Sequence, residues 1–457
     1  MPQTHTQINT AEVRSQDRAH VWHPLFQHST LEQQELIVVD RGEGCFLYDS
    51  DGNKYLDAYS GLWNVNVGYG RKRITDAVCE QMNRLPYYPL SLINEPATTL
   101  AARLADLAPG TLQHVFYSNS GSEANETAFK IARQYGRLKH PDQNRYKIIA
   151  RYQGYHGFTF GAMSATGQTN RRSKFEPLVP GFLHVNPPYC YRCPINLTYP
   201  TCGIGCVEEF EEIIKREDPE TVAAVIAEPV IGGGGVIVPP DEYLPRLREI
   251  CDHYGVLLIF DEVITGFGRT GSFFAADHWD VTPDIITIAK GVTSGYLPLA
   301  ACVVKPEIFE TFLGEPGQRR EFAQVSTYGG HPACCAAALA NIDIIIEEQL
   351  VENSKVIGSY LLNELKALKS PVLGEVRGKG LMLALDLKEP GSNSFLNEKT
   401  TAKIKTAIRN DGVLIGQMSH VTSPPESTLF LAPPLVITKN EADQIINAVT
   451  AGMHAAT

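Results

Sequence analysis

Short runs of β-branched and other apolar residues alternate with longer amphipathic stretches between about residues 110 and 310. Strands separated by helical stretches favour βαβ units, in which helices cover both faces of a parallel sheet. The alternation therefore predicts an α/β fold with a mostly parallel sheet. Five runs have the length and composition of its strands, at 115–117, 147–150, 222–227, 256–260 and 285–289.

The pattern changes on either side of this region. In the C-terminal third, helical stretches at 333–348 and 352–368 precede a strand at 381–387, which indicates a smaller α+β unit. Near the N-terminus, 44–48 and 54–57 read as a hairpin. We expect three parts: an N-terminal arm with part of a small domain (1–65), a large domain (66–330) and a C-terminal small domain (331–457).

Composition narrows the class of protein. The chain has 457 residues, of which 43% are hydrophobic, and this length exceeds that of one compact domain. Its formal net charge of −11 makes it a poor partner for nucleic-acid phosphates. The start lacks a signal-peptide pattern, and no stretch approaches the ~20 apolar residues that span a bilayer. We expect a cytoplasmic enzyme that acts on small molecules, with no membrane association.

Ten cysteines are too dilute in so long a chain for a disulfide scaffold. One cluster, Cys190, Cys193, Cys202 and Cys206, has a spacing that could hold Zn²⁺. Its prolines and glycine indicate an irregular loop, so ordinary reduced thiols are the preferred interpretation. We therefore expect no metal.

Lys290 and Asp261 each follow a predicted strand, and ligands of open α/β sheets bind outside the carboxyl ends of strands. A partly desolvated amine has a lowered pKa and can form a Schiff base with an aldehyde. Pyridoxal 5'-phosphate (PLP) is the aldehyde that fits, because Asp261 would supply the carboxylate for its pyridine nitrogen. The competing interpretations are an ordinary surface lysine and, for Asp261, a helix cap or a salt bridge.

A PLP site also needs a phosphate cradle and a flat partner for the ring. Ser120, Gly121 and Ser122 lie between a strand and a helix, where backbone N–H groups and the helix dipole favour an anion. An ordinary serine cap would give the same pattern. Tyr155 stands in a Gly-rich turn that could lay it on the ring, and His156 follows in a supporting or a direct role. The alternative is a structural turn with a buried tyrosine.

Two further residues are cofactor candidates. Val263, two residues after Asp261, could close the ring face opposite Tyr155. Thr327 is a hydroxyl in a Gly-rich loop, where turn chemistry is the plain interpretation and spacing alone does not single it out.

Together these segments resemble the class III (ω-amino acid) aminotransferases of the type I PLP fold. The resemblance extends over most of the chain, from Trp22-His23-Pro24 to Ala432-Pro433-Pro434-Leu435. Its most specific parts are Ser-Gly-Ser-Glu-Ala at 120–124, Tyr-His-Gly at 155–157, Ala-Glu-Pro-Val at 227–230, Asp-Glu-Val-Ile-Thr-Gly-Phe-Gly-Arg at 261–269 and Lys290.

The resemblance implies roles for individual residues. Lys290 would be the Schiff-base lysine and proton shuttle, Asp261 would pair the pyridine nitrogen, and Tyr155 would stack on the ring. Glu228 matches the family's strand-end glutamate near the cofactor, and Trp63 matches an aromatic wall of the substrate pocket.

The phosphate is expected to bind to residues of both subunits. The resemblance places it on Ser120, Gly121 and Ser122 of one subunit and on Thr327 of the other. A homodimer follows from this sharing, and a tetramer is left open.

The C-terminal segment departs from many relatives, which carry an arginine there that clamps a substrate carboxylate. The last arginine of the chain is Arg409, and Phe430 occupies one of the family's arginine positions. We name Gln417, Ser419 and His420 as candidates to meet the substrate anion. The departure argues against an ornithine- or 4-aminobutyrate-type enzyme that uses 2-oxoglutarate.

Taken together, the residues and the resemblance predict an ω-aminotransferase that moves the amino group of taurine, or of a similar donor such as β-alanine, to pyruvate by a ping-pong mechanism. A diamine or diaminopelargonate-type aminotransferase is the alternative within the family, since Trp22-His23-Pro24 fits that group too. A PLP-free Schiff-base aldolase and a non-catalytic binding protein are the alternatives from other classes.

Overall fold

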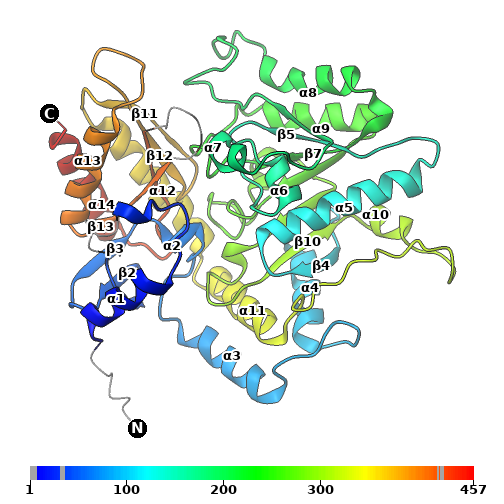
Figure 1. Ribbon diagram of the computed structural model, residues 1–457, viewed down its shortest axis with the longest axis horizontal. Helices are drawn as coiled ribbons and strands as arrows, with labels where there is room; N and C mark the ends of the chain where they lie inside the picture. Colours follow the sequence, from blue (N-terminus) through cyan, green and yellow to red (C-terminus); the bar gives the residue numbers. More distant parts are fainter. Residues whose placement is uncertain (1–7, 31–35, 419–420, 422–426, 457) are drawn as a thin grey trace.

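The computed structural model describes residues 8–30, 36–418, 421 and 427–456. Within them, the largest sheet has seven strands in the order β4-β10-β9-β8-β7-β5-β6 (Figure 1). The five runs predicted as strands are β4, β5, β7, β8 and β9, with bounds shifted by at most one residue. The seven strands are β4 His114–Ser118, β5 Lys147–Arg151, β6 Phe182–Val185, β7 Val222–Ala227, β8 Leu257–Asp261, β9 Ile285–Ile288 and β10 Ala300–Val304.

Most of this sheet is parallel, as predicted. Four of its six pairings are parallel, and β10 alone runs antiparallel, between β9 and β4. The sequence pattern did not identify β6 or β10. In β10 the run Ala-Ala-Cys-Val-Val begins with two alanines, which carry little strand preference. Because β9 and β10 are antiparallel neighbours, the loop between them, which begins with Lys290, lies at the carboxyl edge of β8 and β9.

Helices connect the strands and cover the sheet (Figure 1). No helix of the described residues is long and apolar enough to cross a membrane. The helices are α1 Thr10–His20, α2 Ser60–Trp63, α3 Lys72–Arg84, α4 Glu95–Leu107, α5 Gly121–Lys139, α6 Phe160–Ala165, α7 Thr169–Arg172, α8 Gly205–Arg216, α9 Tyr243–Tyr254, α10 Pro306–Thr311, α11 Pro332–Glu347, α12 Leu350–Ala367, α13 Glu398–Asn410 and α14 Lys439–His454.

The two faces of the large sheet are buried against different helices. Ile148 and Ile226 belong to an apolar cluster with the inner face of α5, whereas their neighbours Ile149 and Val225 belong to a second cluster that includes α8 and α9. Successive side chains of a strand point to opposite faces, so burial on both faces explains the continuous apolar runs of the sequence.

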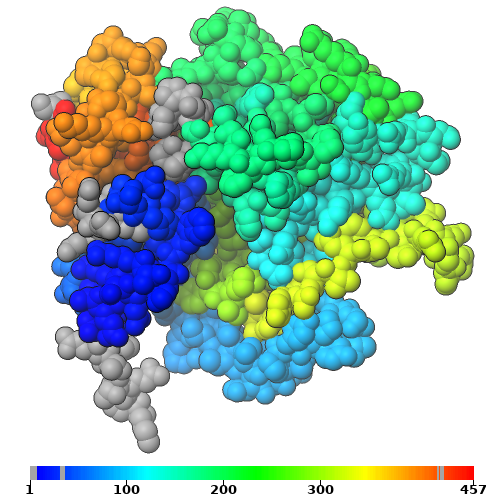
Figure 2. Space-filling view, in the orientation of Figure 1, coloured from blue at the N-terminus to red at the C-terminus, as the bar shows by residue number. Residues whose placement is uncertain are grey.

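Two smaller sheets are built from strands of the N-terminal segment and the C-terminal part. The first joins β1 Val39–Glu43, β2 Phe46–Asp49 and β3 Lys54–Asp57 to β13 Val413–Leu414, and the second joins β11 Leu373–Gly378, β12 Leu383–Leu387, β15 Thr428–Leu431 and β14 Gly416–Met418. β2 and β3 form the predicted hairpin. Figure 2 shows the N-terminal segment (blue) beside the C-terminal part (orange).

The predicted domain bounds remain predictions. The pairing of β3 with β13 puts part of residues 1–65 in a sheet with the C-terminal part. Helix α11, which begins just after residue 331, packs on α3 and α4.

Arg269 joins three parts of the molecule. Its fully buried guanidinium donates to the carbonyl oxygens of Leu381 at 3.0 Å and Pro433 at 2.5 Å, and to Asn66 Oδ1 at 2.7 Å. Asn66 Nδ2 in turn donates to the carbonyl oxygen of Phe267 at 2.9 Å. The loop after β8, the N-terminal segment and the C-terminal part are therefore held together by one buried side chain.

Candidate active site

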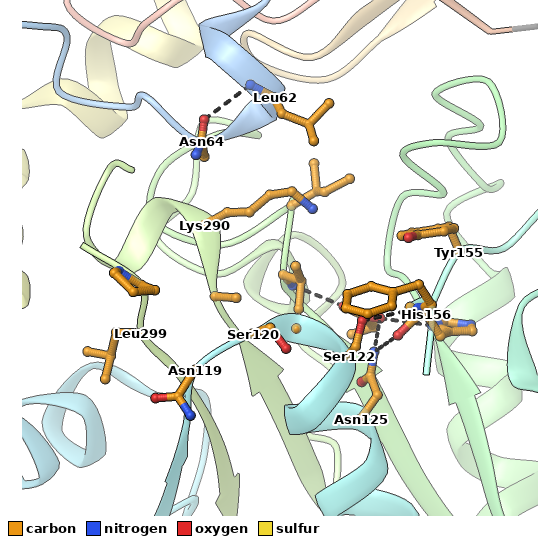
Figure 3. Close-up of a pocket in the computed structure, with 18 of the residues that line it drawn as sticks. Leu62, Asn64, Asn119, Ser120, Ser122, Asn125, Tyr155, His156, Lys290 and Leu299 are labelled. Carbon is orange, nitrogen blue, oxygen red and sulfur yellow. Dashed lines mark hydrogen bonds and ion pairs between the residues drawn. The ribbon is translucent and has the colours of Figure 1, made fainter. Parts of the chain in front are cut away.

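A cavity of about 500 Å³ lies at the carboxyl edge of the large sheet (Figure 3). It is formed by the segments that follow β4, β5, β7, β8 and β9, which is where ligands bind in open α/β sheets. The structure thus brings together nine of the residues named from the sequence: Ser120, Gly121, Ser122, Tyr155, His156, Glu228, Asp261, Val263 and Lys290.

Lys290 begins the short helical turn that follows β9, and its side chain extends into the cavity on the side of Tyr155 (Figure 3). Its φ of +45° is a left-handed value that costs a non-glycine residue of order 1 kcal/mol, and such strain is concentrated at functional sites. Its amine has no hydrogen bond or ion pair within the described part of the chain. Burial lowers its pKa, an effect that Asp261 and Glu228 partly oppose. The uncharged form of the Lys290 amine is thus favoured relative to that of an exposed lysine.

Asp261 is the last residue of β8, and three donors fix its carboxylate. Oδ2 accepts hydrogen bonds from Asn125 Nδ2 and His156 Nδ1, both at 2.8 Å. From the described residues, Oδ1 accepts one hydrogen bond, from the Val263 N–H at 3.1 Å. Asn125 is itself held by Thr287, whose hydroxyl donates to its Oδ1 at 2.7 Å. The buried carboxylate keeps acceptor capacity on Oδ1 and can bind a cation in the cavity.

Sequence reasoning gave Asn125 no role. It lies one turn after Gly121 on the inner face of α5. The other residues of that face, such as Ala124 and Ala128, are small and apolar, so a polar residue among them could have indicated a functional side chain. It bridges α5 to Asp261 and to the carbonyl oxygen of His156.

Glu228 follows β7 and supports the turn that carries Tyr155. Oε1 accepts the Tyr155 N–H at 3.0 Å, and Oε2 accepts the Gly232 N–H at 2.8 Å. Burial raises the pKa of Glu228, with His156 opposing and Asp261 adding to that effect. Both carboxylate oxygens are engaged by backbone, so Glu228 orients the stacking candidate Tyr155.

The N-terminus of α5 contributes Ser120, Gly121 and Ser122 to the lining of the cavity. Ser120 is its N-cap, since its Oγ accepts the Glu123 N–H at 3.2 Å; the ordinary capping interpretation of this serine is therefore correct and is compatible with a phosphate site. A Cβ at Gly121 would lie 2.9 Å from Val263, so only glycine fits there without displacement. Ser122 Oγ accepts the Phe158 N–H at 3.1 Å.

Three sequence-predicted residues lie outside the cavity. Trp63 is buried against Phe430, with ring centroids 4.3 Å apart and an interplanar angle of 12°, so Leu62 contacts the cavity in its place. Thr327 is exposed, and its carbonyl oxygen accepts the Tyr87 hydroxyl at 2.7 Å. Gln417 lies in β14, paired with Leu429.

The other two substrate candidates, Ser419 and His420, fall outside the described residues. The four clustered cysteines, Cys190, Cys193, Cys202 and Cys206, line a separate cavity of about 20 Å³. In the described part of the chain no group of three or more His, Cys, Asp or Glu residues is arranged to hold a metal ion.

The comparison with protein families identifies this architecture. A model of the class III aminotransferases, "Aminotransferase class-III", matches residues 28–452. The chain belongs to the class III aminotransferase family. Family and fold are therefore as the sequence predicted.

Similar proteins cover almost the whole chain. The uncharacterized aminotransferase YhxA of Bacillus subtilis (strain 168) is 45% identical, over 96% of this chain and 95% of the relative. The taurine–pyruvate aminotransferase of Bilophila wadsworthia is 41% identical, over 96% of both chains. The putrescine–pyruvate aminotransferase of Pseudomonas aeruginosa (strain PAO1) is 38% identical, over 96% of this chain and 95% of the relative.

Solved structures of transaminases also match almost the whole chain. An (S)-enantioselective ω-transaminase from Thermomicrobium roseum is 44% identical with a TM-score of 0.92, and the match covers 99% of this chain and 100% of that one. An amine transaminase from an uncultivated Pseudomonas species, solved in a PLP-bound form, is 37% identical with a TM-score of 0.90, over 96% of this chain and 99% of that one.

Class III aminotransferases depend on PLP, and the cavity fits it. Within the described residues the Lys290 amine has no partner, Asp261 Oδ1 offers acceptor capacity, and the N-terminus of α5 lines the cavity with Ser120, Gly121 and Ser122, where a phosphate could bind.

Proposed function

We propose that this aminotransferase moves the amino group of taurine, or of a similar ω-amino donor such as β-alanine, to pyruvate in two half-reactions. The observation that carries the catalytic part is the Lys290 amine, which has no partner among the residues that the structure describes, in one cavity with the donor-fixed carboxylate of Asp261. When bound, PLP supplies an electron sink and carries the amino group between the half-reactions.

In this proposal Lys290 moves the proton. Its amine would take the proton from the amino-bearing carbon of the donor and transfer it to the carbon of PLP that carries the aldehyde. A base in this role needs a pKa near the working pH, and the lowered pKa of Lys290 serves that need.

Asp261 holds the proton on the pyridine nitrogen. A carboxylate opposite that nitrogen favours its protonated form. Asn125 and His156 fix the orientation of the carboxylate, and Tyr155 and Val263 are proposed to cover the two faces of the ring.

The phosphate is proposed to bind at Ser120, Gly121 and Ser122. Thr327 of a second subunit would complete that site, which makes the enzyme a homodimer. Thr327 is exposed and is not among the residues that line the cavity of its own chain, which is compatible with a role across a subunit interface.

The donor and acceptor are proposed from the relatives. Two of them carry pyruvate in their names, one with taurine and one with putrescine. The missing arginine after Arg409 favours a small oxo acid such as pyruvate over 2-oxoglutarate, whose second carboxylate needs its own partner.

A donor panel tests the proposal. The purified holoenzyme is mixed with taurine, β-alanine, putrescine or 4-aminobutyrate, and the first half-reaction is followed by cofactor absorbance. We expect taurine or β-alanine to react fastest and pyruvate to restore the starting spectrum. Fastest reaction with putrescine would support the diamine alternative and refute the proposed donor.

Borohydride reduction tests the lysine. Peptide mapping of the reduced holoenzyme should place the cofactor on Lys290, and Lys290→Ala should retain cofactor but lose transamination. Appreciable turnover in this variant would refute the role of Lys290. A wild-type protein that binds no PLP would instead favour the aldolase or the binding protein.

A further inference from the structure

We propose that a second pocket of this protein, outside the active site, binds a phosphate group, either as free phosphate or as part of a phosphomonoester. The pocket lies between the loop after β8, helix α12 and the turn that joins β11 to β12, and its volume is about 360 Å³. Small ligands bind in cavities of roughly 300–1,000 Å³. No residue lines both this pocket and the PLP cavity, so the inference goes beyond the proposed function and does not depend on it.

Glycines let three distant backbone segments meet at this pocket. A Cβ at Gly380 would lie 2.3 Å from the carbonyl carbon of Thr270, and a Cβ at Gly358 would lie 2.1 Å from the carbonyl oxygen of Gly380. A Cβ at Gly271 would lie 3.1 Å from the Cα of Lys355. Gly271 and Gly380 also have left-handed φ values of +84° and +56°. The walls of the pocket are therefore closely packed backbone, which holds the side chains between them in fixed relative positions.

Two lysines supply positive charge to the pocket. Lys379 is half-buried, its amine lies 5.0 Å from the centroid of the Trp279 ring, and it has no ion pair among the described residues. Lys355 is exposed, and its ion pair with Glu352 is long, at 4.0 Å, and exposed at both ends, so that pair contributes little. Burial lowers the pKa of Lys379, and Asp241, which does not line the pocket, opposes that effect. Both amines are available to an anion.

The two amines act on one imidazole. Burial and the charges of Lys379 and Lys355 lower the pKa of His278 to about 4. His278 Nε2 contacts the carbonyl oxygen of Thr270 at 3.0 Å and its hydroxyl at 3.1 Å. A cation lowers the pKa of an imidazole when the two charges are close, so both lysine charges reach the same part of the pocket. None of the described residues that line it is acidic, although the whole chain has a formal net charge of −11.

Backbone donors favour a phosphate over a carboxylate. The N–H groups of Ser272 and Gly380, which both line the pocket, have no hydrogen-bond partner in the described part of the chain. A phosphomonoester carries nearly two negative charges and three strong acceptor oxygens, which match two ammonium groups and further N–H donors. Asp277, which accepts the Ser272 hydroxyl at 3.2 Å, is exposed and does not line the pocket.

Calorimetry tests the site in holoenzyme prepared with saturating PLP, so that the phosphate of the cofactor occupies the active site. Inorganic phosphate and glycerol 3-phosphate are titrated separately. We expect the wild type to bind at least one of them, and Lys379→Met to weaken that binding by roughly 10- to 100-fold, the range for a lost hydrogen bond to a charged group. Lys379→Arg keeps the charge and should weaken binding less.

A preference for either ligand supports the site and names its source, a free ion or a phosphomonoester. No binding of either ligand by the wild type, or unchanged binding in Lys379→Met, would overturn the proposal. If Lys379→Met does not fold, Lys355→Met at an exposed position provides the same test with the same two outcomes.

Lys399→Met is the matched control. Lys399 is an exposed lysine of α13 that does not line the pocket, so its replacement removes the same charge elsewhere. We expect this variant to bind phosphate as the wild type does. Equal weakening in Lys399→Met and Lys379→Met would show a general effect of net charge and overturn the specific site.

Thermal unfolding of the holoenzyme gives a second readout that needs no turnover. A ligand that binds only the folded state raises Tm by mass action. Phosphate should therefore raise the Tm of the wild type more than sodium chloride of equal ionic strength does, and this difference should be lost in Lys379→Met. Equal shifts with both salts in the wild type would contradict a phosphate site. A failure to transfer amines would count against the proposed function alone, because neither measurement depends on transfer.

Discussion

Replacing Asp261 by asparagine tests the central electrostatic claim of the site. The variant keeps the shape of the side chain and removes its charge. In the wild type Oδ2 accepts Asn125 and His156 at 2.8 Å, and Oδ1 accepts Val263 at 3.1 Å. An asparagine oxygen in the place of Oδ2 can keep the first two bonds, which turns the amide NH₂ toward the Val263 N–H and toward the cofactor ring.

The size of the effect follows from the lost charge. A hydrogen bond to a charged group contributes about 1.5–3 kcal/mol, and 1.36 kcal/mol corresponds to a factor of ten. The ring nitrogen should therefore hold its proton roughly 10- to 150-fold less strongly in Asp261→Asn. We expect the rate of the donor half-reaction to fall at least as much, because the electron sink depends on that proton.

The assay is a single-turnover absorbance measurement with saturating donor, and PLP affinity is measured separately by titration of the cofactor-free protein. Asn125→Ala is the graded control, since it removes one donor to Asp261 but leaves the charge. A net hydrogen bond contributes about 1 kcal/mol, so this variant should slow roughly fivefold. A half-reaction rate for Asp261→Asn within threefold of the wild-type rate would refute the reasoning. So would a folded Asn125→Ala variant that slows as much as Asp261→Asn does.

Three further predictions follow from the site and its surroundings. Because burial lowers the pKa of Lys290, its amine is protonated only at a lower pH than in the unfolded chain, and that protonation favours unfolding. Reductive methylation of the cofactor-free protein, followed by mass spectrometry, should therefore label Lys290 down to a lower pH than it labels exposed lysines. The same pH profile for Lys290 and exposed lysines would contradict this. Gly121→Ala should weaken PLP binding, because its Cβ would lie 2.9 Å from Val263; an unchanged affinity in a cofactor titration would show that the approach is not tight. Phe430→Ala should lower the free energy of unfolding by about 3–5 kcal/mol through loss of its buried stack on Trp63, and a loss below about 1 kcal/mol in denaturant titration would contradict the packing.

The parts of the site that the sequence predicted are local features. Lys290 follows a strand, Asp261 ends one, and the Ser120 cap precedes a helix, so runs of a few residues were enough to put all three at the carboxyl edge of a parallel sheet. The same reasoning found five of the seven strands. PLP dependence and the class III family, expected from the resemblance, are confirmed by the match over residues 28–452.

The remaining features depend on contacts between distant segments. The orientation of Trp63 is set by Phe430 from the other end of the chain, so no local pattern showed that its ring faces the core. Asn125 acquires its function only when α5 packs beside β8.

The buried guanidinium of Arg269 limits which parts of this enzyme can change when it acquires a new substrate specificity. Swinging the C-terminal part away from the loop after β8 would strip the carbonyl oxygens of Leu381 and Pro433 of their donor in a dry interior, at about 1–3 kcal/mol each. Hinge opening at this point is therefore disfavoured, and the scaffold around Lys290 is rigid. New amine specificities should arise by exchange of side chains at the cavity wall, with Leu62 as the first position for a mutant library.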